Sequence, residues 1–152
     1  MADGRVVIVG GGGVGDSAAF QLRTDGFDGE IVIVSGDSDR PYDRPYLSKE
    51  FLRGEVEREK VFLRPEADYE SARIELRQGV RVTGGDLSGR RLFLEDGSEL
   101  QFASLALATG GTPWRLPAFS PPDYVYPPRP PPDIPVRPPP PPGAGARAPA
   151  WP

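Results

Sequence analysis

The residues with the clearest chemical potential lie in one glycine-rich run near the N-terminus. A β-branched run over residues 6–9 is followed at once by glycines, and Gly10, Gly12 and Gly15 have the spacing G-x-G-x-x-G. In such a motif the first glycine allows a tight turn, the second lets backbone approach a diphosphate, and the third permits close helix–strand packing. A helix starting there offers unpaired N–H groups and the positive end of its dipole to phosphate. The motif predicts a dinucleotide site, and a glycine-rich loop without a ligand is the alternative.

The elements expected around this loop form a βαβ unit. Residues 5–9 are typical of a buried parallel strand, because they form a short apolar run ended by glycine. A helix is expected from Gly13 to about Thr24, and residues 31–34 are a second β-branched run. The helix has one apolar face, made by Val14, Ala18 and Leu22. Such a unit has a right-handed crossover.

The remaining pattern predicts an α/β fold. We expect a Rossmann-like dinucleotide-binding domain with a parallel sheet and a small antiparallel hairpin. A parallel sheet needs helices over both faces, so a chain without the later helices would leave apolar surface open. Short helices are expected over 46–53 and 66–72, strands over 80–83 and 105–108, and a hairpin of 92–94 and 99–102 around Asp96-Gly97.

An acidic residue follows the second strand at the distance that ribose binding needs. Asp37 comes 22 residues after Gly15, close to the ~20 residues typical of the acid that binds a ribose. Its carboxylate can accept both ribose hydroxyls. Asp39 is a competing candidate, and a solvated turn carboxylate is the other alternative.

A second candidate lies in the loop from Pro41 to Lys49. Pro41 and Pro45 keep the segment between them out of a helix interior, so we expect an ordered loop that presents Arg44 and Lys49. Judged from residue types alone, these two cations are equally well explained as surface charges and as contacts to a phosphate or a ring.

Composition divides the chain into two parts. Of the 152 residues, those at 1–119 have the composition of an ordinary α/β section, whereas 120–152 are rich in proline. Such a tract adopts polyproline II or stays disordered. We expect a solvated, disordered tail; docking of its Pro-x-x-Pro patterns beside Arg129 and Arg137 in an aromatic groove is the alternative.

Charge and residue usage exclude several functions. The net charge of −4, with no basic cluster, argues against a nucleic-acid partner. The chain contains neither cysteine nor histidine, so we expect no disulfide, no thiolate or imidazole ligand and no metal site. Cysteine absence fits a reducing cytoplasm. We see no secretory pattern and no segment long enough to span a membrane.

At this point the sequence resembles a known family. It is similar to the N-terminal FAD-binding part of the FAD-dependent pyridine nucleotide oxidoreductases, and most similar to the ferredoxin and rubredoxin reductase group. The resemblance covers about residues 4–117 and is carried by the glycine run and by segments 26–31, 41–49 and 107–110. The proline-framed loop 41–49 is its most specific piece. Disulfide-reductase relatives carry a redox cysteine pair there, and this chain has no cysteine.

The resemblance implies roles for individual residues. Asp37 would bind the adenosine ribose, Arg44 the adenosine–phosphate region, and Val82 the adenine through its backbone. The FAD diphosphate would be held by Gly10, Gly12 and Gly15 with Gly13 and Val14 alongside, and the cofactor near its phosphates would be lined by Ala108, Thr109 and Gly110. Lys49 would approach the reactive nitrogen of the flavin, where a cation stabilises reduced flavin, and is the one catalytic assignment.

The resemblance also implies an activity. Intact members use FAD to take hydride from NAD(P)H and pass electrons singly to a small iron–sulfur protein of the ferredoxin or rubredoxin type. No NAD(P)H domain is evident here, so we expect a FAD-binding portion rather than a complete catalyst. An NAD-binding Rossmann fragment and a non-enzymatic proline-rich interaction protein are the alternatives.

Some positions depart from the family pattern. Asp16 stands where the family has a small or apolar residue, and its carboxylate would repel a nearby phosphate. After Pro113 the family has an arginine, whereas this chain has Trp114 and then Arg115. The similarity fades near Pro117. One hypothesis is a shifted reading frame beyond about residue 120, which sequencing of the coding region would test.

Overall fold

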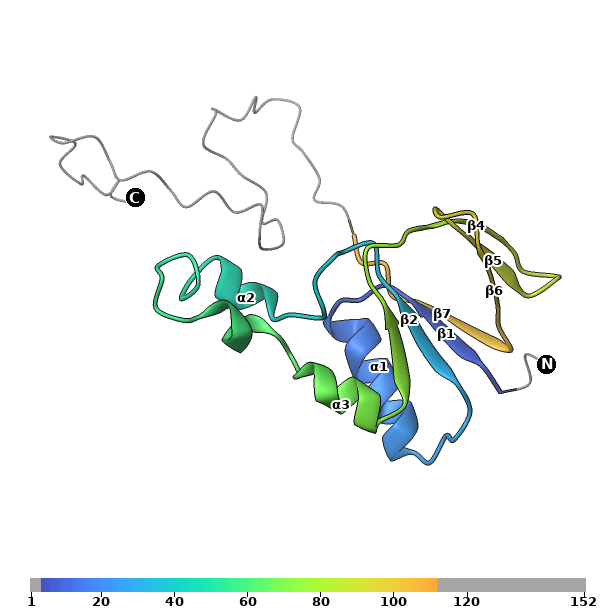
Figure 1. The fold of residues 1–152 in the computed structure, drawn as a ribbon, viewed down its shortest axis with the longest axis horizontal. Coiled ribbons are helices and arrows are strands. Elements are labelled where there is room, and N and C mark those ends of the chain that lie inside the picture. The colour runs from blue at the N-terminus through green and yellow to red at the C-terminus, as the bar shows by residue number, and fades with distance from the viewer. Residues whose placement is uncertain (1–3, 112–152) are drawn as a thin grey trace, which may run out of the picture.

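The glycine-rich run lies between a strand and a helix in the computed structural model, which describes residues 4–111 (Figure 1). Strand β1 spans Val6–Val9, helix α1 spans Gly13–Thr24 and strand β2 spans Ile31–Val34, so the predicted βαβ unit is confirmed. The expectations for 113–115 and for the tail from 120 lie outside the described residues. Within the described part, no helix is long and apolar enough to cross a membrane.

The strands around β1 form a four-stranded parallel sheet. Its order is β3-β2-β1-β7, where β3 is Ile74–Arg77 and β7 is Ser104–Leu107. Val7 of β1 pairs with Val32 on one side and with Leu105 on the other. All carboxyl ends therefore meet at one edge of the sheet, and ligands of open α/β sheets bind at such an edge.

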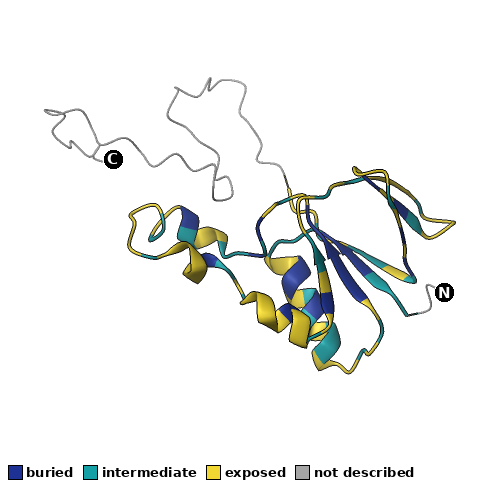
Figure 2. Cartoon of the chain, viewed as in Figure 1, coloured by how far each residue is buried: buried dark blue, intermediate teal, exposed yellow. Residues whose placement is uncertain are grey.

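The two faces of the parallel sheet are covered differently. Ile8 and Ile33 face the side of α1 and α3 (Glu66–Ser71). Val7 and Val9 face a second, antiparallel sheet of order β4-β5-β6, formed by Val82–Asp86, Arg91–Leu94 and Glu99–Gln101. The second face is therefore not left open as expected, because apolar side chains of this small sheet bury it. Figure 2 shows the buried residues concentrated along β1 and β2.

The segment between β2 and α3 contains two short helical turns, α2 (Arg44–Leu47) and η1 (Arg58–Val61). They lie beyond the carboxyl ends of the parallel strands, away from the antiparallel sheet (Figure 1). The helix expected over 46–53 was misplaced. It starts at Arg44 because Pro45 fits the first turn, where no N–H is needed. The helix expected over 66–72 is confirmed as α3, which begins just after Pro65.

Two strands differ from the sequence expectation, and the hairpin agrees with it. Strand β3 was not predicted, because this short segment becomes a strand by pairing with β2 at the edge of the parallel sheet. Strand β4 begins two residues after the expected start at 80. The hairpin between β5 and β6 is confirmed, and its turn residue Gly97 has a φ of +82°. The strand expected over 105–108 is confirmed as β7, but the expectation that it is buried was wrong. β7 forms an edge of the parallel sheet, its residues are half-buried or exposed, and Leu107 is 74% exposed.

The apolar face of α1 was partly wrong. Ala18 and Leu22 pack on the core as expected, but Val14 is 73% exposed. The inward side of the first turn is occupied instead by Gly15 and Asp16, both buried. Val14 is left facing outward at the start of the helix.

Two glycines of this turn should respond oppositely to alanine. A Cβ on Gly15 would lie 2.0 Å from the Gly10 carbonyl oxygen, whereas one on Gly13 would meet only Leu63 at 3.9 Å. We expect Gly15→Ala to lower the free energy of unfolding by about 1–3 kcal/mol through overpacking. Gly13→Ala should be neutral or raise it by about 0.5–1 kcal/mol, because alanine favours helix. Urea unfolding followed by circular dichroism measures both, and equal effects would contradict the packing described.

Candidate functional site

The glycine loop is clamped between the ends of three parallel strands. Gly10 has a φ of +122°, and a Cβ there would lie 2.1 Å from the carbonyl oxygen of Ala108, just after β7. The Gly10 N–H donates to the carbonyl of Val34 at 2.8 Å. A Cβ on Gly11 would lie 2.5 Å from Ser35 Oγ, just after β2. Neither Gly10 nor Gly11 therefore has room for a side chain at this junction.

The mouth of the loop is open where the junction ends. A Cβ on Gly12 would meet nothing within 4 Å, and this residue is the N-cap of α1 with no side-chain hydrogen bond. The first intrahelical bond runs from the Asp16 N–H to the Gly12 carbonyl at 3.0 Å. The N–H groups of residues 13–15 thus have no acceptor within the helix. Donors beside empty space at a helix N-terminus can bind an anion such as a diphosphate.

Asp37 lies next to this mouth through a short chain of contacts. Its N–H donates to Ser35 Oγ at 3.2 Å, and Ser35 packs on Gly11. The hydroxyl of Tyr42 donates to Asp37 Oδ2 at 3.1 Å, which orients the carboxylate. Sequence reasoning did not single out Tyr42, although its place in the proline-framed loop was a signal.

Asp39 has a different environment from Asp37. It is 7% exposed and its Oδ1 is paired with the guanidinium of Arg58. The main-chain N–H of Asp39 donates to Asp37 Oδ1 at 3.1 Å. Between the two candidates, Asp37 is linked to the glycine loop through Ser35, whereas Asp39 is paired with Arg58.

The loop that carries Arg44 and Lys49 is tied down at its base. The N–H of Leu63 donates to the Pro41 carbonyl at 2.9 Å, and the Asp43 N–H donates to the Val61 carbonyl at 2.8 Å. Arg44 and Lys49 are themselves exposed, and neither forms a salt bridge with any residue in the described range. Both cations are therefore available to an anion or a ring.

The remaining predicted residues lie near the same edge. Val82 is the half-buried first residue of β4, and the side chain of Arg81 before it crosses Gly36, whose Cβ would lie 2.8 Å from Arg81 Cγ. The start of β4 thus lies over the end of β2. Thr109 is exposed, and Gly110 has a φ of +72° at the turn after β7. No described group of three or more acidic residues could hold a metal ion.

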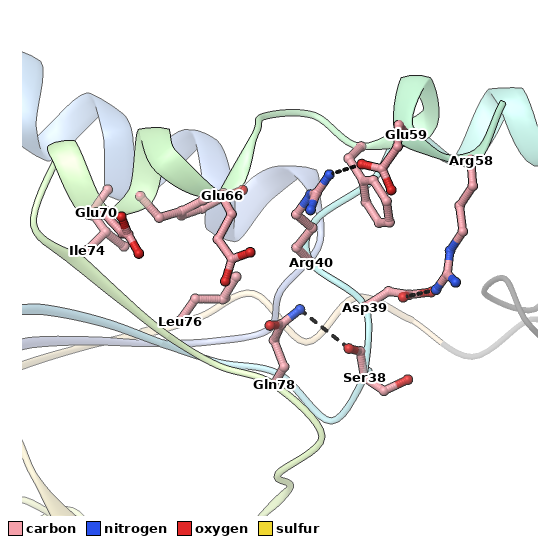
Figure 3. A pocket seen from close by; sticks show the side chains of 12 residues that line it. Ser38, Asp39, Arg40, Arg58, Glu59, Glu66, Glu70, Ile74, Leu76 and Gln78 are labelled. Atoms are coloured by element: carbon pink, nitrogen blue, oxygen red, sulfur yellow. Dashed lines mark hydrogen bonds and ion pairs between the residues drawn. The ribbon is translucent and has the colours of Figure 1, made fainter. Parts of the chain in front are cut away.

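A polar cavity of about 340 Å³ lies elsewhere, between the segment after β2, η1, α3 and β3. Figure 3 shows its charges pairing with one another, Asp39 with Arg58 and Arg40 with Glu59. Among the candidate site residues, the competing acid Asp39 lines it, whereas Asp37, Arg44, Lys49 and the glycines of the loop do not. The cavity is separate from the mouth of the glycine loop.

The bond between Tyr42 and Asp37 predicts a pH dependence. Burial, followed by the charge and hydrogen bond of Asp37, raises the pKa of Tyr42 to about 12 from 10. A raised pKa favours the neutral phenol in the folded state, so this stabilisation is complete below about pH 10 and disappears as the pH approaches 12. Unfolding free energy should therefore fall more steeply over this range in the wild type than in Tyr42→Phe.

Urea unfolding at several pH values measures this difference. Tyr46→Phe, in the same loop, is the matched control and should follow the wild type, because no described carboxylate accepts a hydrogen bond from Tyr46. Parallel curves for the wild type and Tyr42→Phe would contradict the prediction.

Two reductases from Pseudomonas putida are similar to this chain in sequence. The ferredoxin–NAD(+) reductase component of the p-cumate 2,3-dioxygenase system of Pseudomonas putida is 44% identical over 112 residues, 74% of this chain and 28% of that relative. Rubredoxin-NAD(+) reductase of Pseudomonas putida is 38% identical over 111 residues, 73% of this chain and 29% of the relative. The chain thus spans less than a third of the length of these relatives.

A solved structure shares the fold. The covalent putidaredoxin reductase–putidaredoxin complex contains a chain that matches with a TM-score of 0.73 and 38% identity, over 79% of this chain and 29% of the other. The family model described as pyridine nucleotide-disulphide oxidoreductase matches residues 4–122. With that match covering most of its length, this chain belongs to the pyridine nucleotide-disulphide oxidoreductase family.

Proposed function

We propose that this chain is the FAD-binding part of a reductase that moves electrons from NAD(P)H to a small iron–sulfur protein of the ferredoxin or rubredoxin type. The observation that carries the proposal is the open mouth at Gly12, where unpaired helix N–H groups border space that a Cβ would fill. The names of the relatives, which are ferredoxin and rubredoxin reductases, support the electron acceptor.

The residues present fit an FAD molecule. The loop amides would hold its diphosphate, Asp37 would accept the ribose hydroxyls, and the backbone at Val82 would face the adenine. Arg44 would contact the adenosine–phosphate region, where an exposed guanidinium complements negative charge. The diphosphate contacts are proposed for Gly10, Gly12, Gly13, Val14 and Gly15, with Ala108, Thr109 and Gly110 lining the cofactor near them.

Bound FAD would supply the redox chemistry, accepting two electrons as hydride and releasing them one at a time. The protein groups hold and tune it. Lys49 is proposed to lie near the reactive nitrogen of the flavin, where its positive charge favours the reduced, more negative form. The whole reaction needs an NAD(P)H site, which we place in sequence beyond the part matched here.

The same glycine motif also suits NAD. The loop with Arg44 and Lys49 favours FAD, because a simple NAD-binding unit does not require two exposed cations beyond the strand ends. We also propose that the FAD-binding part ends at about residue 119. A cytoplasmic location is proposed as well, and the absence of cysteine supports it.

Replacement of Gly12 tests the site without disturbing the fold. We expect the unaltered chain to retain FAD, seen as a yellow chromophore with a perturbed flavin spectrum. Gly12→Ala should weaken FAD binding at least about tenfold, because its methyl group enters the phosphate space. Its cost to folding should stay below about 1 kcal/mol. Spectroscopic FAD titration and thermal unfolding measure the two effects.

Gly84→Ala in β4 is the matched control, since its Cβ would make an ordinary 3.6 Å contact with Phe93. It should bind FAD like the wild type. Retention of NAD without FAD by the unaltered chain would contradict the proposal, as would full FAD affinity in Gly12→Ala.

The proposed role of Lys49 has its own test. Lys49→Gln should lower the midpoint potential of bound FAD by about 30 mV, which is about 1.4 kcal/mol for two electrons. The cause is the loss of a positive charge that stabilises the reduced ring. Spectroelectrochemical titration measures the potential. Lys60→Gln, which removes the other lysine of the chain, should leave it unchanged; equal potentials in all three proteins would refute the assignment.

A further inference from the structure

A buried carboxylate lies in the first turn of α1, directly below the mouth of the glycine loop. Asp16 is 2% exposed, and its N–H closes the first helical bond to Gly12. A buried charge is costly unless it is paired. A negative charge one turn from a diphosphate site should also weaken the binding of that anion. The structure must therefore compensate Asp16 if the site is to hold FAD.

Two side chains from distant sequence positions provide that compensation. Arg64 Nε lies 3.0 Å from Asp16 Oδ2, and the hydroxyl of Tyr69 lies 2.5 Å from Oδ1. The Arg64 guanidinium also lies 3.8 Å from the centre of the Phe20 ring. Tyr69 meets the same ring edge-on at 5.3 Å. Phe20 and Asp16 of α1 thus fix both partners.

The two partners of Asp16 contribute differently. Burial, followed by the hydrogen bond and charge of Asp16, raises the pKa of Tyr69, so its hydroxyl stays a neutral donor. The Tyr69 hydroxyl donates a hydrogen bond to Asp16 Oδ1 but leaves the negative charge of the carboxylate unchanged. Arg64 is the one residue in the described range that forms a salt bridge with Asp16. Of the two partners, Arg64 alone offsets the negative charge of Asp16.

We infer that Arg64 is a positioning residue for FAD: without touching the cofactor, it cancels the charge of Asp16 and so sets the affinity of the diphosphate mouth. This inference rests on the proposed function and adds a determinant outside the glycine motif. It also accounts for the carboxylate at a position where the family resemblance predicts a small or apolar residue. The carboxylate is tolerated because Arg64, Tyr69 and Phe20 enclose it.

Charge-removing variants of the full chain test the inference by FAD titration. Arg64→Gln should weaken FAD binding roughly tenfold, because Asp16 is left unpaired. The double variant Asp16→Asn/Arg64→Gln should restore affinity to within about twofold of the wild type, although it has lost two native groups. Asp16→Asn alone should bind FAD more tightly than the wild type, since Arg64 then contributes an uncompensated positive charge.

If Arg64 had a purely structural role, its loss would lower stability without changing FAD affinity. Arg23→Gln serves as the control for such a role. Arg23 donates to four backbone carbonyls near the far end of α1, so its loss should lower the unfolding temperature without changing FAD affinity. The inference is overturned if Arg64→Gln binds FAD normally, or if removing the Asp16 charge fails to restore binding. Failure of the unaltered chain to bind FAD would instead reject the proposed function, and this inference with it.

Discussion

The close approach of Gly15 to the carbonyl of Gly10 determines the geometry of the rest of the site. With 2.0 Å between that oxygen and the position of a Cβ, only glycine lets α1 start directly against the end of β1. The helix N-terminus is thereby aimed at the edge where all parallel strands end. This contact also fixes where the loop residues between the two glycines lie, including Gly12, beside which there is open space. A side chain at the junction would move the donors away from the edge.

Two layers hold this arrangement in place. On one side α1 and α3 pack on Ile8, Ile31 and Ile33, and on the other the antiparallel sheet packs on Val7 and Val9. β1 is buried on both faces, so its end cannot shift without opening both cores. The loop residues of the site thus lie on a rigid base. The exposed cations Arg44 and Lys49 lie in a segment tied to that base through Pro41 and Asp43.

How much the sequence predicts depends on the range of the interactions. Helix α1 and strands β1 and β2 follow from buried β-branched runs and glycine spacing within thirty residues, and their bounds were anticipated closely. Strand β3 was missed because it becomes a strand only by pairing with β2. The start of α2 depended on how Pro45 is accommodated, and the covering of the second sheet face depended on long-range packing of the hairpin region.

The candidate site follows the same division. The glycine loop, Asp37 and the strand end at Ala108 come from local spacing and from family resemblance. The role of Tyr42 depends on a contact only five positions away, which sequence reasoning did not single out. The role of Arg64 depends on a contact across the fold, 48 positions from its partner, so no local pattern reveals it. Asp16 seemed incompatible with a phosphate site as an isolated residue. The ion pair of the buried Asp16 with the partly exposed Arg64 offsets that charge.

The central claim is that backbone donors at the start of α1 grip the diphosphate of a flavin cofactor. The most direct measurement compares FAD with riboflavin, which has the same ring but no diphosphate, by flavin fluorescence titration of the same preparation. The account predicts that FAD binds at least about a hundredfold more tightly and that ADP displaces it. Equal affinity for the two flavins, or no displacement by ADP, would contradict it.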